Sequence, residues 1–110
     1  MEKMSLKTLC DLVGVSRRSI QSYEKVGLMT STSKNKYGHL LYDENALHRA
    51  RMIKFMQKLG FKLREIKEII DAPSDVIKEA LKRRIKELEI EVSEIEQIIR
   101  EANEYIKGLK

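Results

Sequence analysis

The sequence predicts an all-α fold with a small β-wing: a winged helix-turn-helix followed by one long coiled-coil helix. Three observations lead to this prediction. Two short amphipathic stretches meet at Gly14, a polar segment with a short apolar run follows them, and a heptad repeat begins after Pro73. This proline is the only one in the chain, and it separates two predicted parts, residues 1–72 and residues 73–110.

The first two predicted helices form the helix-turn-helix. The apolar residues of the first recur at i, i+3, i+4 and i+7, which places them on one face: Leu6, Leu9, Cys10 and Val13. Ser5 is a suitable N-cap, and Gly14 can turn with a positive φ at no steric cost. Ser16 can cap the second helix, which runs to about Lys25 and stops at Gly27.

The rest of the first part contains a loop, a strand and two further helices. Residues 30–38 are polar and predict an exposed loop, and residues 39–42 are consistent with a short strand of a β-ribbon or wing. Asp43 can cap a third helix that ends at Gly60. A shorter fourth helix is expected at about residues 62–70.

The second part has the most regular apolar period in the chain. Its apolar residues alternate spacings of four and three over four heptads: Leu81, Ile85, Leu88, Val92, Ile95, Ile99, Ala102, Ile106 and Leu109. A 3.5-residue repeat of this kind indicates a coiled-coil helix about 40 Å long. Since no other segment is long enough to cover the stripe within the chain, we expect a homodimer.

The net charge of +5 is concentrated in the N-terminal half. Residues 1–60 contain 11 Lys and Arg against 5 Asp and Glu, whereas residues 61–110 contain 11 against 12. A basic half favours a polyanionic partner, because each cation at a phosphate releases condensed counterions. An ordinary solvated surface is the alternative.

The second predicted helix has the side chains that DNA recognition needs. At 100° per residue, one arc of about 140° contains the residues Arg17, Arg18, Gln21, Ser22 and Lys25. Arginine can bind guanine, and glutamine can bind adenine, through two hydrogen bonds each. With the cap residue Ser16, these residues are the predicted contacts to double-stranded DNA. The solvated face of an amphipathic helix is the alternative interpretation.

Two further groups could reach the DNA backbone. The predicted wing supplies Lys34, Lys36, Tyr37 and His39, and the third helix supplies Arg49, Arg51 and Lys54. A polar loop with two lysines is common on any protein surface, so on its own it is weak evidence for DNA binding.

Other functions find little support in the sequence. Cys10 lies in an apolar stripe and predicts a core residue, and neither His39 nor His48 has metal-ligand neighbours at suitable spacing. No catalytic constellation or phosphate-binding glycine loop is found, so we expect no enzyme and no cofactor. Neither a membrane span nor a secretory signal is found, which favours a cytoplasmic protein associated with the nucleoid.

Three ordered motifs resemble the MerR family of bacterial transcription regulators. Residues 14–20 with residues 23–28 are similar to the turn and recognition helix of that family. Gly38 with Tyr42 resembles its wing signature, and residues 59–61 with Leu63, Glu65 and Ile66 resemble its leucine-glycine-phenylalanine junction.

The resemblance implies a winged helix-turn-helix and an antiparallel two-stranded coiled coil. It implies a homodimer that binds a near-palindromic promoter site and distorts it, with RNA polymerase or a regulatory protein as a further partner. Arg18 matches the recognition-helix arginine of the family, and Tyr23 and Tyr42 match tyrosines near the DNA backbone.

The chain also departs from the family. Gln21 and Ser22 stand where arginine and tyrosine are usual, and His39 and Leu40 replace tyrosine and arginine in the wing. No effector domain or C-terminal cysteines follow the long helix, so the sequence is expected to be a short member or a truncated one. An architectural or recombination-directing DNA-binding protein, and a coiled-coil adaptor that has lost DNA binding, are the alternatives.

Overall fold

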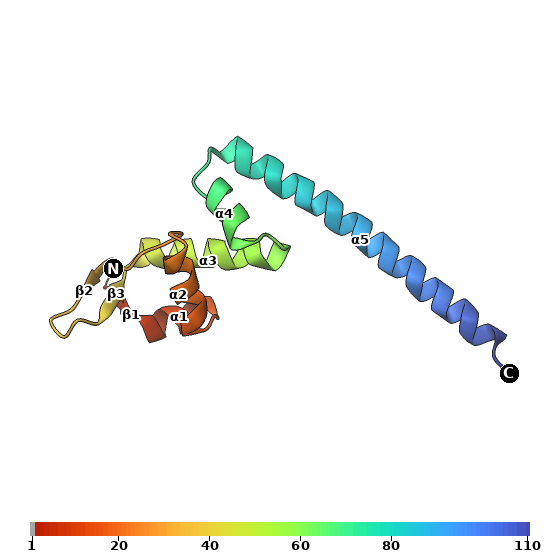
Figure 1. The fold of residues 1–110 in the computed structure, drawn as a ribbon, viewed down its shortest axis with the longest axis horizontal. Helices are drawn as coiled ribbons and strands as arrows, with labels where there is room; N and C mark the ends of the chain where they lie inside the picture. Colours follow the sequence, from red (N-terminus) through yellow and green to blue (C-terminus); the bar gives the residue numbers. More distant parts are fainter. Residues whose placement is uncertain (1) are drawn as a thin grey trace. The chain divides into compact units, whose positions relative to one another are not determined.

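The computed structural model describes residues 2–110, and the chain divides into two compact units, Met1–Ala72 and Pro73–Lys110 (Figure 1). Over the described residues, the first unit contains four helices and three short strands, and the second contains one helix. The winged helix-turn-helix and the long C-terminal helix predicted from the sequence are therefore confirmed.

The helix-turn-helix is formed by α1 (Leu6–Val13) and α2 (Arg17–Lys25). Both N-caps are the predicted serines, since Ser5 accepts a hydrogen bond from the backbone of Thr8 and Ser16 accepts one from the backbone of Ser19. Gly14 lies between the helices with φ of 79°, a left-handed conformation that glycine adopts without strain. Local capping signals therefore set the boundaries of both helices.

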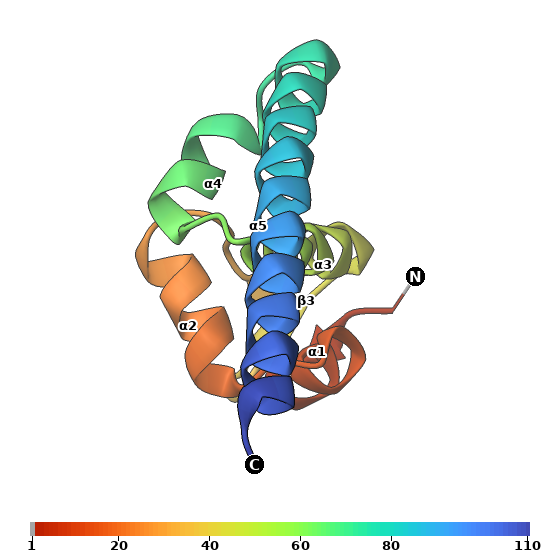
Figure 2. The same cartoon turned by 90° about the vertical axis from the view of Figure 1, so that its right-hand side faces the viewer.

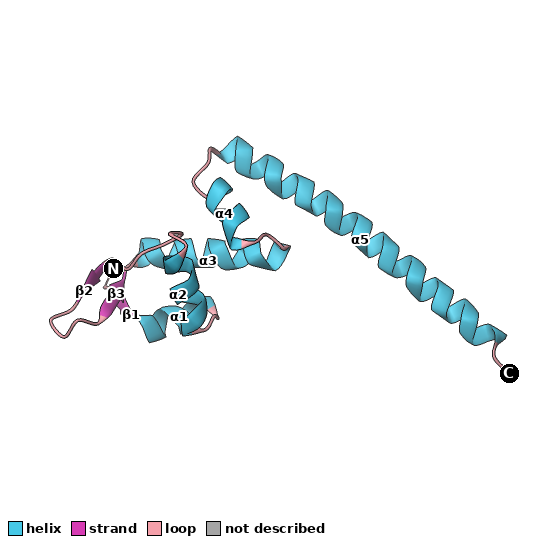
Figure 3. Cartoon of the chain, in the orientation of Figure 1, coloured by secondary structure: helices cyan, strands magenta, loops and turns pink. Residues whose placement is uncertain are grey.

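The wing is a three-stranded antiparallel sheet in the order β1-β3-β2 (Figure 3). Its central strand β3 (Leu40–Tyr42) pairs with β1 (Met4–Ser5) on one side and β2 (Ser33–Lys34) on the other. The sequence predicted β3 but treated residues 30–38 as loop and missed β1. Two-residue strands contain no periodic pattern, so only their pairing with β3 identifies them.

Two further helices complete the first unit, α3 (Glu44–Leu59) and α4 (Leu63–Ile69). Asp43 caps α3 by accepting a hydrogen bond from the backbone of Ala46, and this bond lowers the pKa of the Asp43 carboxyl. Gly60 ends α3 in a left-handed conformation, as the sequence predicted.

The core of the first unit lies where its four helices and β3 meet. Its largest fully buried side chains are Leu9, Ile20, Tyr23, Leu28, Tyr42, Ile53, Met56 and Ile66. Helix α2 contributes only Ile20 and Tyr23 to this core, which leaves most of its circumference outside. This is the arrangement expected of a helix that presents a recognition surface.

The second unit is the single unbroken helix α5 (Ser74–Gly108), visible as a continuous rod in Figure 2. Its 35 residues correspond to about 52 Å at 1.5 Å per residue. Pro73 precedes the first turn, where its missing N–H leaves no helical bond unmade. None of the helices among the described residues combines the length and apolar character needed to cross a membrane.

Candidate nucleic-acid interface

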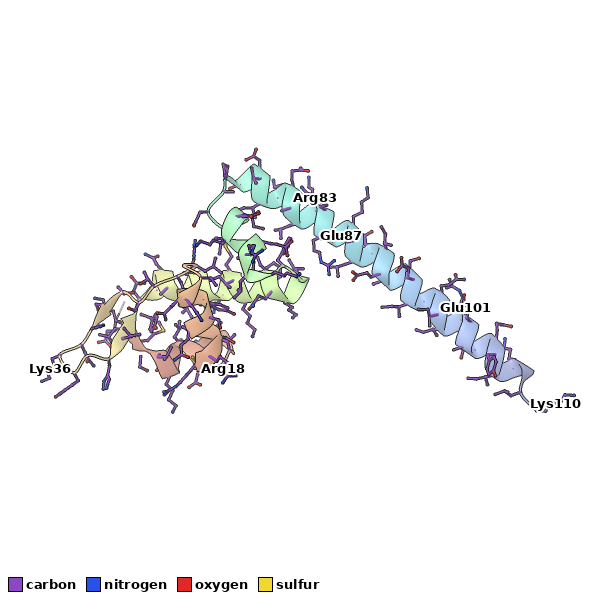
Figure 4. All side chains as sticks on the ribbon, viewed as in Figure 1. Arg18, Lys36, Arg83, Glu87, Glu101 and Lys110 are labelled. Atoms are coloured by element: carbon purple, nitrogen blue, oxygen red, sulfur yellow. The ribbon has the colours of Figure 1, made fainter. Side chains whose placement is uncertain are left out.

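Helix α2 presents the predicted DNA-reading side chains on its outer face. Arg17, Arg18, Gln21 and Lys25 are exposed, and Ser22 is half-buried. In Figure 4, Arg18 projects from the start of α2 at the edge of the unit. The exposure of these side chains agrees with the helical-wheel prediction that they lie on one outer arc. Their contact with DNA remains a prediction.

Two buried tyrosines fix the orientation of α2. The Tyr23 hydroxyl donates to Gln57 Oε1 of α3 at 2.7 Å, and the Tyr42 hydroxyl of β3 donates to Glu24 Oε1 at 2.6 Å. Burial raises the pKa of both phenols, and the Glu24 carboxylate raises that of Tyr42 further. Tyr23 and Tyr42 were predicted to lie near the DNA backbone. In the structure, the hydroxyl of each donates its hydrogen bond to another side chain of the first unit.

A third link holds the chain immediately after α2. The Arg49 Nε donates to the backbone carbonyl of Leu28 at 2.7 Å, while its two terminal nitrogens bind both carboxylate oxygens of Asp71. The hydrogen bond to Asp71 raises the pKa of Arg49, and the same bond lowers the pKa of Asp71. One guanidinium therefore joins the segment after α2 to the last residues of the first unit.

Lys54 reaches from α3 to the turn between α1 and α2. Its ammonium donates to the carbonyls of Val13 and Gly14 at 2.9 and 3.2 Å. A cation at this point satisfies carbonyls that the helix cannot pair and complements the negative end of the α1 dipole. In this structure Lys54 stabilises the turn of the helix-turn-helix, and a phosphate contact by Lys54 remains only a prediction.

The tip of the wing gathers three of the predicted residues. The Asn35 side chain accepts hydrogen bonds from the backbone N–H groups of Tyr37 and His39, at 2.9 and 3.0 Å, and so shapes the turn. The Lys36 ammonium lies 5.1 Å from the centre of the Tyr37 ring, within the range of a cation–π interaction. Figure 4 shows Lys36 at the far end of the hairpin.

A hollow of about 370 Å³ lies between the wing and the helix-turn-helix. It is lined by Ser5, Leu6, Lys7, Arg17, Asn35, His39, Leu40 and Leu41. Arg17 and His39 were predicted DNA contacts, whereas Lys7 was not. Lys7 stands in the first turn of α1, and only the folding of the wing beside that turn brings it near the other two. Arg51 is exposed on α3 and does not line this hollow.

The predicted dimer seam on α5 is largely open to solvent. No residue of α5 is buried, and the seam residues Ile85, Val92, Ile95, Ile99, Ile106 and Leu109 are each about half exposed or more. Leu81 and Leu88 are half-buried, and Ala102 is exposed. An apolar stripe of this length is unusual on the surface of a monomer.

The described residues contain no cluster of three or more His, Cys, Asp or Glu side chains placed to hold a metal ion. Cys10 is buried within the first unit, and burial raises the pKa of its thiol.

Comparison with known proteins decides the family. Residues 4–73 match the model of the MerR HTH family regulatory proteins, and residues 47–104 match the model described as MerR, DNA binding. The chain belongs to the MerR family. The first match covers the winged helix-turn-helix, and the second extends from α3 along most of α5.

Relatives of this MerR-family chain include longer proteins. It is 34% identical over 79 residues to the HTH-type transcriptional activator mta of Bacillus subtilis, covering 72% of this chain and 31% of the relative. It is 28% identical over 85 residues to the nodulation protein NolA of Bradyrhizobium elkanii, covering 77% and 38%. The chain thus spans about a third of the length of these two relatives.

Solved structures share the fold. MtaN, the N-terminus of the Bacillus subtilis multidrug transporter activator, has a TM-score of 0.78 and 28% identity, covering 94% of this chain and 98% of MtaN. HiNmlR, a MerR family regulator lacking the sensor domain and bound to promoter DNA, has a TM-score of 0.70 and 18% identity, covering 90% and 80%.

Tyr42→Phe should destabilise this MerR-family chain, since it leaves the half-buried Glu24 carboxylate without the hydroxyl donor. We expect a loss of about 1–2 kcal/mol in the free energy of unfolding, measured by urea denaturation. Glu24→Gln is the matched control, because its amide oxygen can still accept the bond and a smaller loss should result. Equal losses in the two variants would contradict this assignment.

Proposed function

We propose that this chain is a transcription regulator that binds a near-palindromic promoter site as a homodimer and distorts the DNA between the two half-sites. The observation that carries the proposal is the exposed basic face of α2 beside a basic wing, in a chain whose long helix has an unpartnered apolar stripe. The DNA-bound HiNmlR, which shares the fold and lacks a sensor domain, supports it.

In the proposed complex, α2 enters the major groove and the wing follows the adjacent backbone. Arg18 and Gln21 read base edges, because both are exposed and can form paired hydrogen bonds to a base. Arg17, Lys7 and His39 line one hollow, where the positive charges of Arg17 and Lys7 are suited to a phosphate. Further contacts come from Ser16, Ser22, Lys25, Lys34, Lys36 and Tyr37.

The charges of α5 support antiparallel pairing of the two copies. The segment between Lys78 and Lys86 has five basic residues, whereas Glu87 to Glu104 is acidic with Arg100 its only basic residue. Figure 4 shows Arg83 and Glu101 in the two segments. An antiparallel pair over the whole seam sets the basic segment of each copy against the C-terminal end of the other and so separates the two basic segments, which a parallel pair would align with each other.

Promoter distortion implies further partners. Such a regulator acts by changing how RNA polymerase meets the promoter, and a regulatory protein is the alternative partner. A solved complex of EcmrR with DNA, which shares the fold at 19% identity, comes from an assembly named EcmrR-RPo. A DNA-bound role would place the chain in the cytoplasm with the nucleoid.

Selection from a pool of random duplexes, followed by sequencing at near-physiological salt, tests the proposed function. We expect an enriched inverted repeat, with half-sites spaced for two recognition helices of one dimer. Binding without an enriched motif would instead favour an architectural DNA-binding protein. A dimer that binds no DNA would favour the coiled-coil adaptor. This alternative rests on Gln21, Ser22, His39 and Leu40, which differ from the residues usual in the family.

Lys34→Ala should lower the slope of log affinity against log salt concentration by about one per protomer, with the sequence preference unchanged. Lys34 is exposed on β2, where its ammonium can reach a phosphate but reads no base. Binding titrations at several salt concentrations measure the slope. Lys107→Ala on α5 is the control and should leave the slope as it is; an unchanged slope for Lys34→Ala would remove it from the interface.

A further inference from the structure

His39 lies at the candidate nucleic-acid interface with its ring exposed. Its backbone N–H donates to the Asn35 side chain at 3.0 Å, which fixes the residue at the end of the wing turn. Its ring lies beside that of Tyr37, with 6.3 Å between the ring centres, and it lines the hollow between the wing and the helix-turn-helix. Within the described part of the chain, no hydrogen bond or ion pair occupies the imidazole nitrogens. The ring can therefore bind a group that enters the hollow.

The charged groups around His39 are cationic. Lys7 of α1 and Arg17 of α2 line the same hollow, and the Lys36 ammonium lies 5.1 Å from the centre of the Tyr37 ring on the wing. Among the described residues that line the hollow, none is acidic. An anion in the hollow would thus meet positive charge from both helices of the helix-turn-helix and have no carboxylate to repel it.

Histidine differs from these cations because its charge depends on pH. It is the side chain that ordinarily titrates between about pH 5 and 8. A phosphate beside the ring favours the charged form, since opposite charges attract, and the charged ring has two N–H donors where the neutral ring has one. A phosphate held in the hollow would therefore be bound more strongly by a protonated His39 than by a neutral one.

We infer that His39 binds a DNA phosphate in its protonated form, so that each protomer takes up a proton on binding DNA and binds more tightly as the pH falls. The inference rests on the proposed function, which assigns this hollow to a phosphate. Because the bound state holds more protons than the free state, affinity is highest at low pH and is lost as the pH rises through the titration of the bound ring. Tyrosine, which is usual at this position of the family, keeps its proton over the same range and would give no such response.

Other ionisable groups leave this titration visible between about pH 5.5 and 8. Burial raises the pKa of Cys10 and of Tyr42, so both stay protonated, and hydrogen bonds lower the pKa of Asp43 and of Asp71, so both stay ionised. The second histidine of the chain, His48, is exposed on α3 and does not line the hollow. His48→Gln is therefore the matched control for a change at His39.

Titration of a random-sequence duplex at several pH values tests the inference, because a phosphate contact does not depend on base sequence. We expect the affinity of the unchanged chain to fall about tenfold per protomer from about pH 5.5 to about pH 8. His39→Gln stays neutral and should bind at every pH as the unchanged chain binds at the upper end. His39→Arg stays charged and should keep tight binding throughout. His48→Gln should retain the full response.

The salt dependence provides a second readout, which a pH effect on folding alone would not produce. Each added cation at a phosphate steepens the slope of log affinity against log salt concentration by about one. The slope of the unchanged chain should therefore be steeper at the lower pH, by about one per protomer, whereas the slope of His39→Gln should be the same at both. Calorimetric titration in two buffers of different ionisation enthalpy should show proton uptake that His39→Gln lacks.

The outcomes separate this inference from the proposed function. If His39→Gln binds the duplex with the same pH dependence as the unchanged chain, or if the salt slope does not change with pH, His39 does not bind a phosphate in its charged form and DNA binding still stands. If the unchanged chain binds the duplex at none of the pH values, the inference and the proposed function both fail.

Discussion

Replacing Ile85 and Ile99 by lysine should convert the proposed dimer into a monomer. The two residues are 49% and 54% exposed in the single chain and occupy equivalent seam positions two heptads apart. In a paired helix each lysine would set an unpaired charge against apolar neighbours, which is strongly unfavourable. Light scattering should report the mass of one chain, and affinity for a two-half-site DNA should fall by about 10²–10⁴, since bivalent binding is lost.

Ile90→Lys is the control for this experiment. Ile90 is 56% exposed on the same helix but lies off the seam, so its replacement introduces the same charge without touching the dimer. If the double variant kept the mass of two chains, the seam assignment would be wrong. If both proteins became monomeric, the effect would belong to the added charge and not to the seam.

Arg18→Ala should weaken binding to the selected DNA site by about 1–3 kcal/mol while affecting random DNA much less. Arg18 is exposed in the first turn of α2, the part of a recognition helix that contacts base edges. Titration of both DNA molecules at one salt concentration measures the difference.

Arg18→Lys separates the charge of Arg18 from its geometry. Lysine keeps the positive charge but lacks the planar fork that binds two acceptors of guanine. We therefore expect it to recover binding to random DNA and not the preference for the selected site. Equal losses on both DNA molecules would assign Arg18 to a phosphate instead.

Much of the fold follows from signals that act over a few residues. Ser5, Ser16 and Asp43 cap helices as the sequence predicted, because a capping side chain bonds a backbone N–H only three residues away. Gly14 and Gly60 end α1 and α3 for an equally local reason. Such signals can be recognised without knowledge of the rest of the chain.

Features that depend on distant partners could not be predicted. The sequence offers Lys54 as a cation that could reach the DNA backbone, and it does not indicate that the Lys54 ammonium binds two carbonyls about 40 residues earlier in the chain. Strand β1 exists because Met4 and Ser5 pair with Tyr42 and Leu41, and nothing in two residues indicates that pairing. Lys7 lies in the candidate interface only because the wing packs beside the first turn of α1, which is another contact between distant parts of the chain.

The way α2 is anchored has a consequence for how such a protein can change its target. The hydrogen bonds that orient the helix come from Tyr23 and from Glu24, on or near its inner side. Arg18 and Gln21 take no part in those bonds, so they can be exchanged without tilting the helix they stand on. New operator preferences should therefore be accessible through single substitutions on a scaffold that stays folded, which makes this unit a suitable starting point for retargeting by mutation and selection.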